Sequence, residues 1–117
     1  MNIPNITYSD IKNETIFSKE FTAILFYNKS TAGSFLLELS LKDVFYDLSK
    51  LISVFKIVDL ENEDLARDYK LYSEPSVLFF YKNVLEEIIY GPIPKIKLKE
   101  KLECLIKGCM REKFVKD

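Results

Sequence analysis

The segment from residue 21 to 27, FTAILFY, is an almost unbroken apolar run of strand length. A strand with one face in water alternates apolar and polar residues, whereas a strand covered on both faces, as in a parallel sheet between helical layers, is apolar throughout. Residues 54–58 and 76–81 have the same character, and residues 85–90 follow after the short turn Lys82-Asn83. The pattern predicts a buried sheet whose last two strands form an antiparallel hairpin.

Apolar residues at helical spacing occupy the segments between these strands. Residues 34–52 predict the longest helix, with an apolar stripe made of Phe35, Leu39, Leu41, Val44, Phe45, Leu48, Leu51 and Ile52. Residues 61–69 predict a short charged helix whose inner face carries Leu65, Ala66 and Tyr69. After Pro94, a final helix is predicted that ends at Gly108, with its stripe on Leu98, Leu102, Leu105 and Ile106.

The N-terminal region completes the expected order of elements. Residues 6–8 predict a short first strand, and Ser9 or Asp10 is expected to cap a modest helix toward Ser18. The full order is then β-α-β-α-β-α-β-β-α, which is an α/β fold with a mixed central sheet of four to five strands and helices on both faces.

The length and charge of the chain limit its organisation and its partners. A chain of 117 residues is expected to form one domain, which we place at residues 1–110, followed by a short charged tail at 111–117. Lys and Arg number 17 against 18 for Asp and Glu, so no strong field favours nucleic acid. The start of the chain does not resemble a secretory signal, and no window has the roughly 18 apolar residues of a membrane span. We therefore expect a cytoplasmic protein with no membrane partner and with possible weak self-association.

The chain contains no histidine, which excludes every His-based general base or catalytic triad and most transition-metal sites. Its two cysteines, Cys104 and Cys109, have a spacing that fits neither a redox Cys-x-x-Cys motif nor a zinc pair. We expect Cys104 at the core edge of the last helix and Cys109 in a frayed tail beyond Gly108. No metal site and no cofactor are predicted.

Four short motifs follow one another along the chain. They are Phe26-Tyr27 before Ser30-Thr31-Ala32-Gly33-Ser34, then Asp59-Leu60-Glu61-Asn62 with Leu65-Ala66 and Tyr69, then Ser73-Glu74-Pro75-Ser76, and finally Lys82-Asn83 with Gly91. Their order and spacing resemble the thioredoxin family, over the chain from about Ile3 to Gly108. The hairpin departs from the family by one extra residue and by Val84 in place of a glycine. The resemblance implies a thioredoxin fold.

The resemblance also implies that the usual chemistry is lost, because Thr31 and Ser34 stand where the family carries its two reactive cysteines. A hydroxyl has a pKa far above that of a thiol and cannot form a mixed disulfide. The buried aspartate that relays protons in the family corresponds to Leu25, and the proline that kinks the long helix corresponds to Leu39. The tryptophan before the first cysteine corresponds to Ser30. We expect no dithiol-disulfide oxidoreductase activity.

In the thioredoxin family the proline that corresponds to Pro75 is cis, and the residue before it pairs its backbone with an extended substrate peptide. The resemblance therefore implies a peptide-binding groove made of Tyr27, Ser30, Thr31, Ala32, Gly33, Ser34, Glu74, Pro75 and Gly91, with Tyr72 and Ile93 at its rim. Glu74 is either a solvated charge or a bias toward basic or polar partner segments. Thr31 and Ser34, with Ser30, are expected to cap the long helix, although the same helix end can also bind an anion or a substrate group.

These observations favour a protein-binding or chaperone-like module without catalytic residues. One alternative is an enzyme on the same fold, either a glutathione-type transferase that activates a thiol cosubstrate or a redox protein that uses Cys104 and Cys109. The acidic-Ser pair that such transferases carry after the cis proline is missing after Ser76. A third alternative is a purely structural role within a larger complex.

Overall fold

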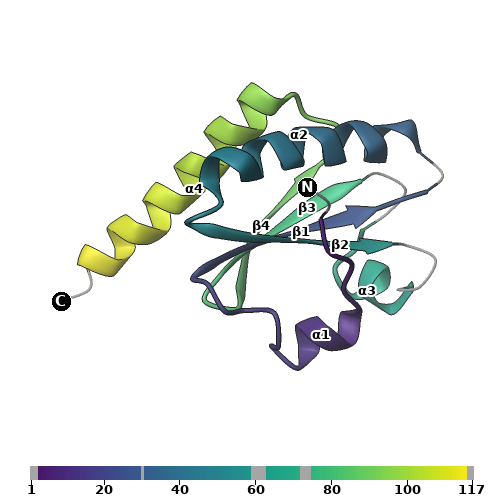
Figure 1. Cartoon of the computed structure of the whole chain (residues 1–117). Helices are drawn as coiled ribbons and strands as arrows, with labels where there is room; N and C mark the ends of the chain where they lie inside the picture. Colours follow the sequence, from purple (N-terminus) through teal and green to yellow (C-terminus); the bar gives the residue numbers. More distant parts are fainter. Residues whose placement is uncertain (1–2, 30, 59–62, 72–74, 116–117) are drawn as a thin grey trace.

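The computed structural model describes residues 3–29, 31–58, 63–71 and 75–115, which form a four-stranded mixed sheet flanked by helices (Figure 1). The strands lie in the order β2-β1-β3-β4. Along the chain the elements are α1 (Tyr8–Lys12), β1 (Phe21–Tyr27), α2 (Ala32–Leu48), β2 (Ile52–Val58), α3 (Glu63–Asp68), β3 (Ser76–Tyr81), β4 (Val84–Tyr90) and α4 (Lys95–Val115). The α/β class and the mixed sheet are as predicted.

The apolar run of β1 lies at the centre of the sheet, parallel to β2 and antiparallel to β3. Its side chains alternate between two cores. Ala23 and Leu25 pack in one core with α2 and α4, and Ile24 and Phe26 pack in the other, beneath α1 and α3. Figure 1 shows these two pairs of helices on opposite faces of the sheet. A strand covered on both faces has no position for a polar alternation, which explains why its sequence is apolar throughout.

The predicted hairpin between β3 and β4 turns at Lys82 and Asn83, which have φ values of 49° and 60°. Two successive residues in the left-handed region form the tight turn that matches the twist of paired strands. Further along, Phe79 lies opposite Glu87 and Phe80 lies opposite Leu85, so Glu86 is an extra residue in β4. Glu86 therefore forms a β-bulge in this hairpin.

The N-terminal region differs from the prediction. In place of a strand at residues 6–8 there is a single parallel bridge between Asn5 and Lys56, and α1 begins at Tyr8. Its cap is Thr7, not Ser9 or Asp10: the Thr7 hydroxyl accepts the Asp10 backbone N–H at 3.3 Å, and the Asp10 carboxylate accepts the Thr7 N–H at 2.9 Å. These two reciprocal bonds form a capping box, which ends the extended segment before a longer strand can form.

Helix α2 also departs from the predicted range of 34–52. It begins at Ala32 and ends at Leu48, and Ile52 opens β2 opposite Phe21. Three members of the predicted stripe, Phe35, Leu39 and Leu51, are exposed. The buried face carries instead Ser34, Leu37, Glu38, Leu41, Val44 and Leu48. Because the first turns of α2 are apolar almost all round, the periodicity alone does not determine which face packs on the sheet.

Helix α4 does not end at Gly108 but continues to Val115, through part of the segment that we expected to be a tail. The two cysteines are placed the other way round from the prediction: Cys104 is exposed and Cys109 is buried. Cys109 follows Ile106 and Leu102 at helical spacing, so the buried stripe simply continues past the glycine. Within the described ranges, no helix combines the length and apolar character required to cross a membrane.

Tyr8 links α1 to α3 through its hydroxyl, which donates a hydrogen bond to the Asp68 carboxylate at 2.8 Å. Burial and this bond to an anion raise the pKa of Tyr8 from 10.0 to about 12. The Tyr8 hydroxyl holds its proton more tightly in the folded protein than in the unfolded chain. The stability that this protonated hydroxyl contributes is therefore complete below pH 10 and is lost as the pH rises toward 12. We expect Tyr8→Phe to be less stable than the wild type at pH 8 and to lose less of its remaining stability between pH 10 and 12. Urea unfolding across this range, with absorbance titration of the tyrosines, measures both effects.

Candidate functional site

Three turns meet at the end of the sheet where the parallel strands β1 and β2 terminate. Gly33, in the first turn of α2, lies so close to two prolines that a Cβ at this position would be 3.4 Å from ring carbons of Pro92 and 3.6 Å from Cγ of Pro75. The Gly91 N–H donates to the Pro75 carbonyl at 2.7 Å. The structure therefore brings together Gly33, Pro75 and Gly91, three of the residues assigned to the expected groove, and adds Pro92. In open α/β sheets, ligands bind outside the carboxyl ends of parallel strands, which is the position of this cluster.

Gly91 forms the turn between β4 and α4 with a φ of 82°. This left-handed conformation is costly for residues with a Cβ, and it allows Pro92 to fold back onto Gly33. We had assigned Gly91 and Ile93 to the expected groove but had not included Pro92, which lies between them. The turn is therefore part of the site and not only a connection.

The hydroxyls of Thr31 and Ser34 fasten the turn that precedes α2. Ser34 Oγ accepts the Asn28 backbone N–H at 2.9 Å and lies 3.0 Å from Thr31 Oγ1, while Thr31 Oγ1 donates to the Asn28 carbonyl at 3.3 Å. Thr31 occupies the N-cap position, yet its side chain accepts no hydrogen bond from the helix, so the predicted capping role is wrong for this residue. Ser34 has 0% of its surface exposed and cannot itself contact a partner.

One turn after Ser34, Glu38 forms an ion pair with Lys56 of β2 at 2.8 Å. Both side chains are largely buried, with 10% and 21% of their surface exposed respectively. The Lys56 ammonium also lies 5.2 Å from the centre of the Tyr27 ring. Leu25 is opposite Lys56 in the sheet and is fully buried. The resemblance places a buried aspartate of the thioredoxin family at the position of Leu25, but here the carboxylate near Lys56 is Glu38 of α2. Sequence reasoning missed Glu38, although it interrupts an otherwise apolar helix face.

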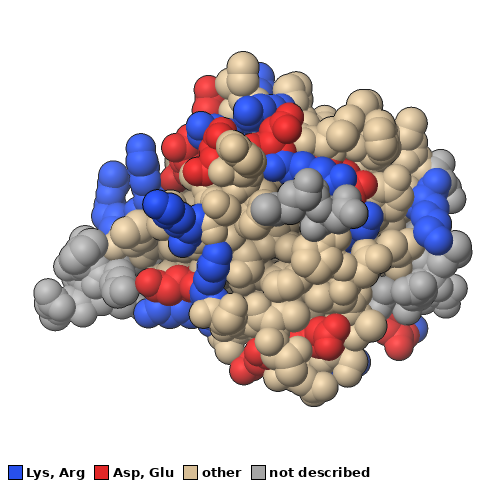
Figure 2. Space-filling view, viewed as in Figure 1, with Lys and Arg blue, Asp and Glu red and all other residues tan. Residues whose placement is uncertain are grey.

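Beside Gly33, the first turns of α2 present large apolar side chains to solvent. The exposed fractions are 54% for Phe35, 54% for Leu36 and 43% for Leu39. Figure 2 shows uncharged side chains gathered over this part of α2. Exposed apolar side chains that lie next to one another are typical of interaction surfaces. We had placed Phe35 and Leu39 in the core, so this surface was also missed.

The remaining predicted groove residues are distributed around this cluster. Ala32 is exposed, whereas Tyr27 and Ile93 are partly buried and pack against the core beneath α2 and α4. Ser30, Tyr72 and Glu74 lie outside the described residues. The predicted cis bond before Pro75 involves Glu74, so it stays a prediction. Among the described residues, no cluster of three or more metal-ligating side chains occurs.

The contact between Gly33 and the two prolines makes a size-dependent prediction. We expect Gly33→Ala to change the free energy of unfolding by less than about 1 kcal/mol, since 3.4 Å is an ordinary contact and alanine favours the helix by about that amount. Gly33→Leu should be clearly less stable, because the longer side chain must displace Pro92 or Pro75. Thermal unfolding of both variants measures the difference, and equal stability of the two would show that the turns do not touch in solution.

No protein-family model matches this sequence, and no curated protein matches it. What the structure establishes is an α/β protein in which three turns converge on Gly33 at one end of a four-stranded sheet.

Proposed function

We propose that this chain is a thioredoxin-fold module without dithiol chemistry, which binds an extended segment of a partner protein on the surface formed by Phe35, Leu36 and Leu39, beside Gly33 and the buried Pro75. The strand order, with β1 parallel to β2 and antiparallel to β3, supports the fold proposal. The exposure of three large apolar side chains directly beside the clustered turns is the observation that carries the functional proposal.

The chemistry of the site favours binding over catalysis. Ser34 is buried and its oxygen already accepts a backbone N–H, so it is not available as a nucleophile. Thr31 is held by Ser34 and by the Asn28 carbonyl, and the chain has no histidine to activate it. The two thiols of the chain lie on α4.

The energy of binding would come mainly from the apolar side chains. Complete burial of a Phe or Leu side chain contributes about 1.5–3 kcal/mol, so covering the half-exposed surfaces of Phe35, Leu36 and Leu39 supplies several kcal/mol. The backbone that precedes Pro75 would orient the partner by pairing with it as an added strand. Such main-chain pairing sets the direction of the partner segment and requires few particular side chains in it.

A displayed library of unstructured peptides tests this proposal. We expect selected peptides to bind the wild type and to bind the double variant Phe35→Ser/Leu39→Ser at least tenfold more weakly in fluorescence anisotropy. Val84→Ser is the matched control, since Val84 is 58% exposed and lies beside the hairpin turn at the opposite end of the sheet. An equal loss in the control, or peptides that are indifferent to both changes, would contradict the proposed surface.

Two enzyme assays separate this function from its alternatives. We expect no acceleration of insulin disulfide reduction by dithiothreitol and no conjugation of glutathione to an electrophilic aromatic substrate. Activity in the first assay that is lost in Cys104→Ser/Cys109→Ser would identify a redox protein using α4. Activity in the second would identify a transferase.

A further inference from the structure

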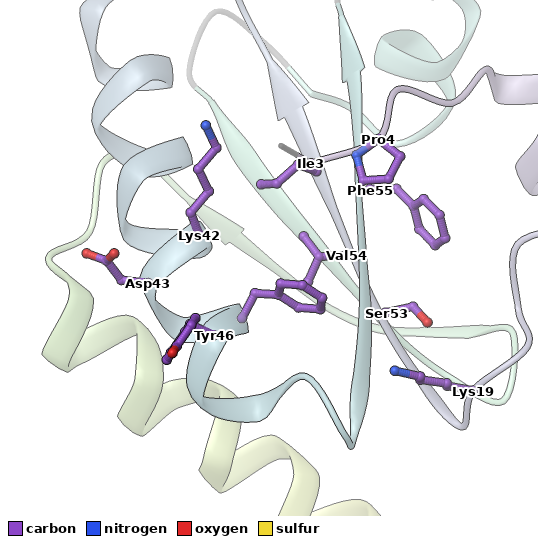
Figure 3. Close-up of a pocket in the computed structure, with 10 residues that line it drawn as sticks. Ile3, Pro4, Lys19, Lys42, Asp43, Tyr46, Ser53, Val54 and Phe55 are labelled. Carbon is purple, nitrogen blue, oxygen red and sulfur yellow. The ribbon is translucent and has the colours of Figure 1, made fainter. Parts of the chain in front are cut away.

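A second candidate site lies along the outer edge of β2, away from the surface proposed above. A hollow of about 610 Å³ opens there between the N-terminal segment, the C-terminal half of α2 and the edge strand (Figure 3). It shares none of its lining with the residues around Gly33 and is lined by Ile3, Pro4, Lys19, Lys42, Asp43, Phe45, Tyr46, Ser53, Val54 and Phe55. Its volume is within the range of small-molecule sites, which is about 300–1,000 Å³.

The hollow exists because the first strand is reduced to one bridge. Lys56 uses its outward backbone groups to bond the Pro4 carbonyl at 2.8 Å and the Ile6 N–H at 2.9 Å. In the same parallel register, the Val54 carbonyl would accept the N–H of residue 4. Pro4 has no N–H, so the N-terminal segment cannot continue this pairing toward Val54. The edge below the bridge is therefore not closed by a strand from residues 3–6.

The floor and walls of the hollow are mainly apolar. Val54 and Phe45 belong to or pack against the core beneath α2, and Ile3 closes one end. Tyr46 is 82% exposed on α2, so its ring is free to cover an occupant. A site of this kind binds an apolar body, and its few polar groups determine the orientation of the ligand.

The charged groups of the rim are two lysines and one aspartate. Figure 3 shows Lys42 on α2, Lys19 across the strand edge with its ammonium turned toward β2, and the Asp43 carboxylate pointing away from the hollow. Lys19 donates to the Ser49 carbonyl at 2.6 Å, a neutral group. Within the part of the chain that the structure describes, neither lysine has an acidic partner. The hollow therefore combines apolar walls with uncompensated positive charge.

We propose that this hollow binds a small free carboxylate with an apolar body, such as an aliphatic or aromatic acid. The apolar portion lies over Val54 and Phe45 beneath Tyr46, and the carboxylate is held by one of the two lysine ammonium groups, which lie at opposite ends of the hollow. This site is independent of the proposed peptide surface, so either can fail without affecting the other.

Octanoate is a suitable probe, with octan-1-ol as its uncharged counterpart. We expect octanoate to bind with one-to-one stoichiometry in calorimetry and to shift the amide resonances of Ser53, Val54 and Phe55. Lys19→Gln/Lys42→Gln should weaken octanoate at least tenfold and leave octan-1-ol unchanged. Tyr46→Ala should weaken both ligands. Lys97→Gln/Lys107→Gln, which makes the same change in net charge on exposed positions of α4, should affect neither.

Three results would overturn the proposal. The first is octanoate and octan-1-ol binding equally well, which would remove the role of charge. The second is an equal loss of octanoate binding in the α4 control variant, or resonance shifts confined to other elements. The third is a ligand-free dimer in sedimentation that Tyr46→Glu disperses, which would mean that a second copy of the chain covers the hollow.

Discussion

Replacing Lys56 with Met should lower the free energy of unfolding by about 3 kcal/mol, because the change leaves the Glu38 carboxylate without its partner at 10% exposure. Removing one member of a largely buried ion pair costs more than the pair contributes, since the remaining charge stays desolvated. Glu38→Leu should be similarly unfavourable, as it leaves the Lys56 ammonium beside the apolar core. Urea unfolding of the single variants measures both losses.

The double variant Glu38→Leu/Lys56→Met should recover most of that loss and lie within about 1 kcal/mol of the wild type, because no charge then remains buried. The exposed pair between Lys101 and Glu87 provides the control. Its side chains are 49% and 34% exposed, so Lys101→Met should cost less than about 1 kcal/mol. A double variant as unstable as either single variant would contradict this explanation. It would show that the attraction between the two charges, and not the cost of removing them from water, governs stability here.

Leu25→Asp should be strongly destabilising, with a loss of about 3–5 kcal/mol at pH 7, since Leu25 has 0% of its surface exposed. Lys56 lies opposite in the sheet but is already paired with Glu38, so it cannot fully compensate a second carboxylate. The change restores the acidic residue that the resemblance places in thioredoxins. It therefore tests whether this chain can still accommodate that group.

The pH dependence distinguishes a buried charge from a simple packing defect. Burial would raise the pKa of the new carboxyl above its value in the unfolded chain, so the folded state would bind the proton more tightly. Leu25→Asp should therefore regain stability as the pH falls from 7 toward 4, relative to the wild type. Leu25→Asn has the same shape without the charge, and its deficit should not change with pH. Parallel profiles for the two variants would contradict this explanation.

The elements that depend on local pattern could be predicted from the amino-acid sequence. The apolar runs of β1 and β3 specify strands buried on both faces, and Lys82-Asn83 specifies the tight turn after β3. Leu98, Leu102 and Ile106 specify the buried stripe of α4. The signals are a continuous apolar run of strand length, a short polar turn and an apolar stripe at about 3.6-residue spacing, and each of them lies within one short segment of the chain. The grouping of Gly33, Pro75 and Gly91 in one groove came instead from the resemblance to the thioredoxin family, since no local pattern links these three positions.

Tertiary structure decided what local pattern leaves open. Phe35, Leu36 and Leu37 are adjacent apolar residues on α2, and only packing on the sheet selects Leu37 for the core and leaves the other two in solvent. Gly108 carries no local signal strong enough to end α4 once Cys109 is buried with Ile106. The Glu38–Lys56 pair and the hollow at the β2 edge join segments far apart in the chain. Periodicity determines the type of an element, whereas the burial of one face over another depends on contacts that form only when distant segments meet.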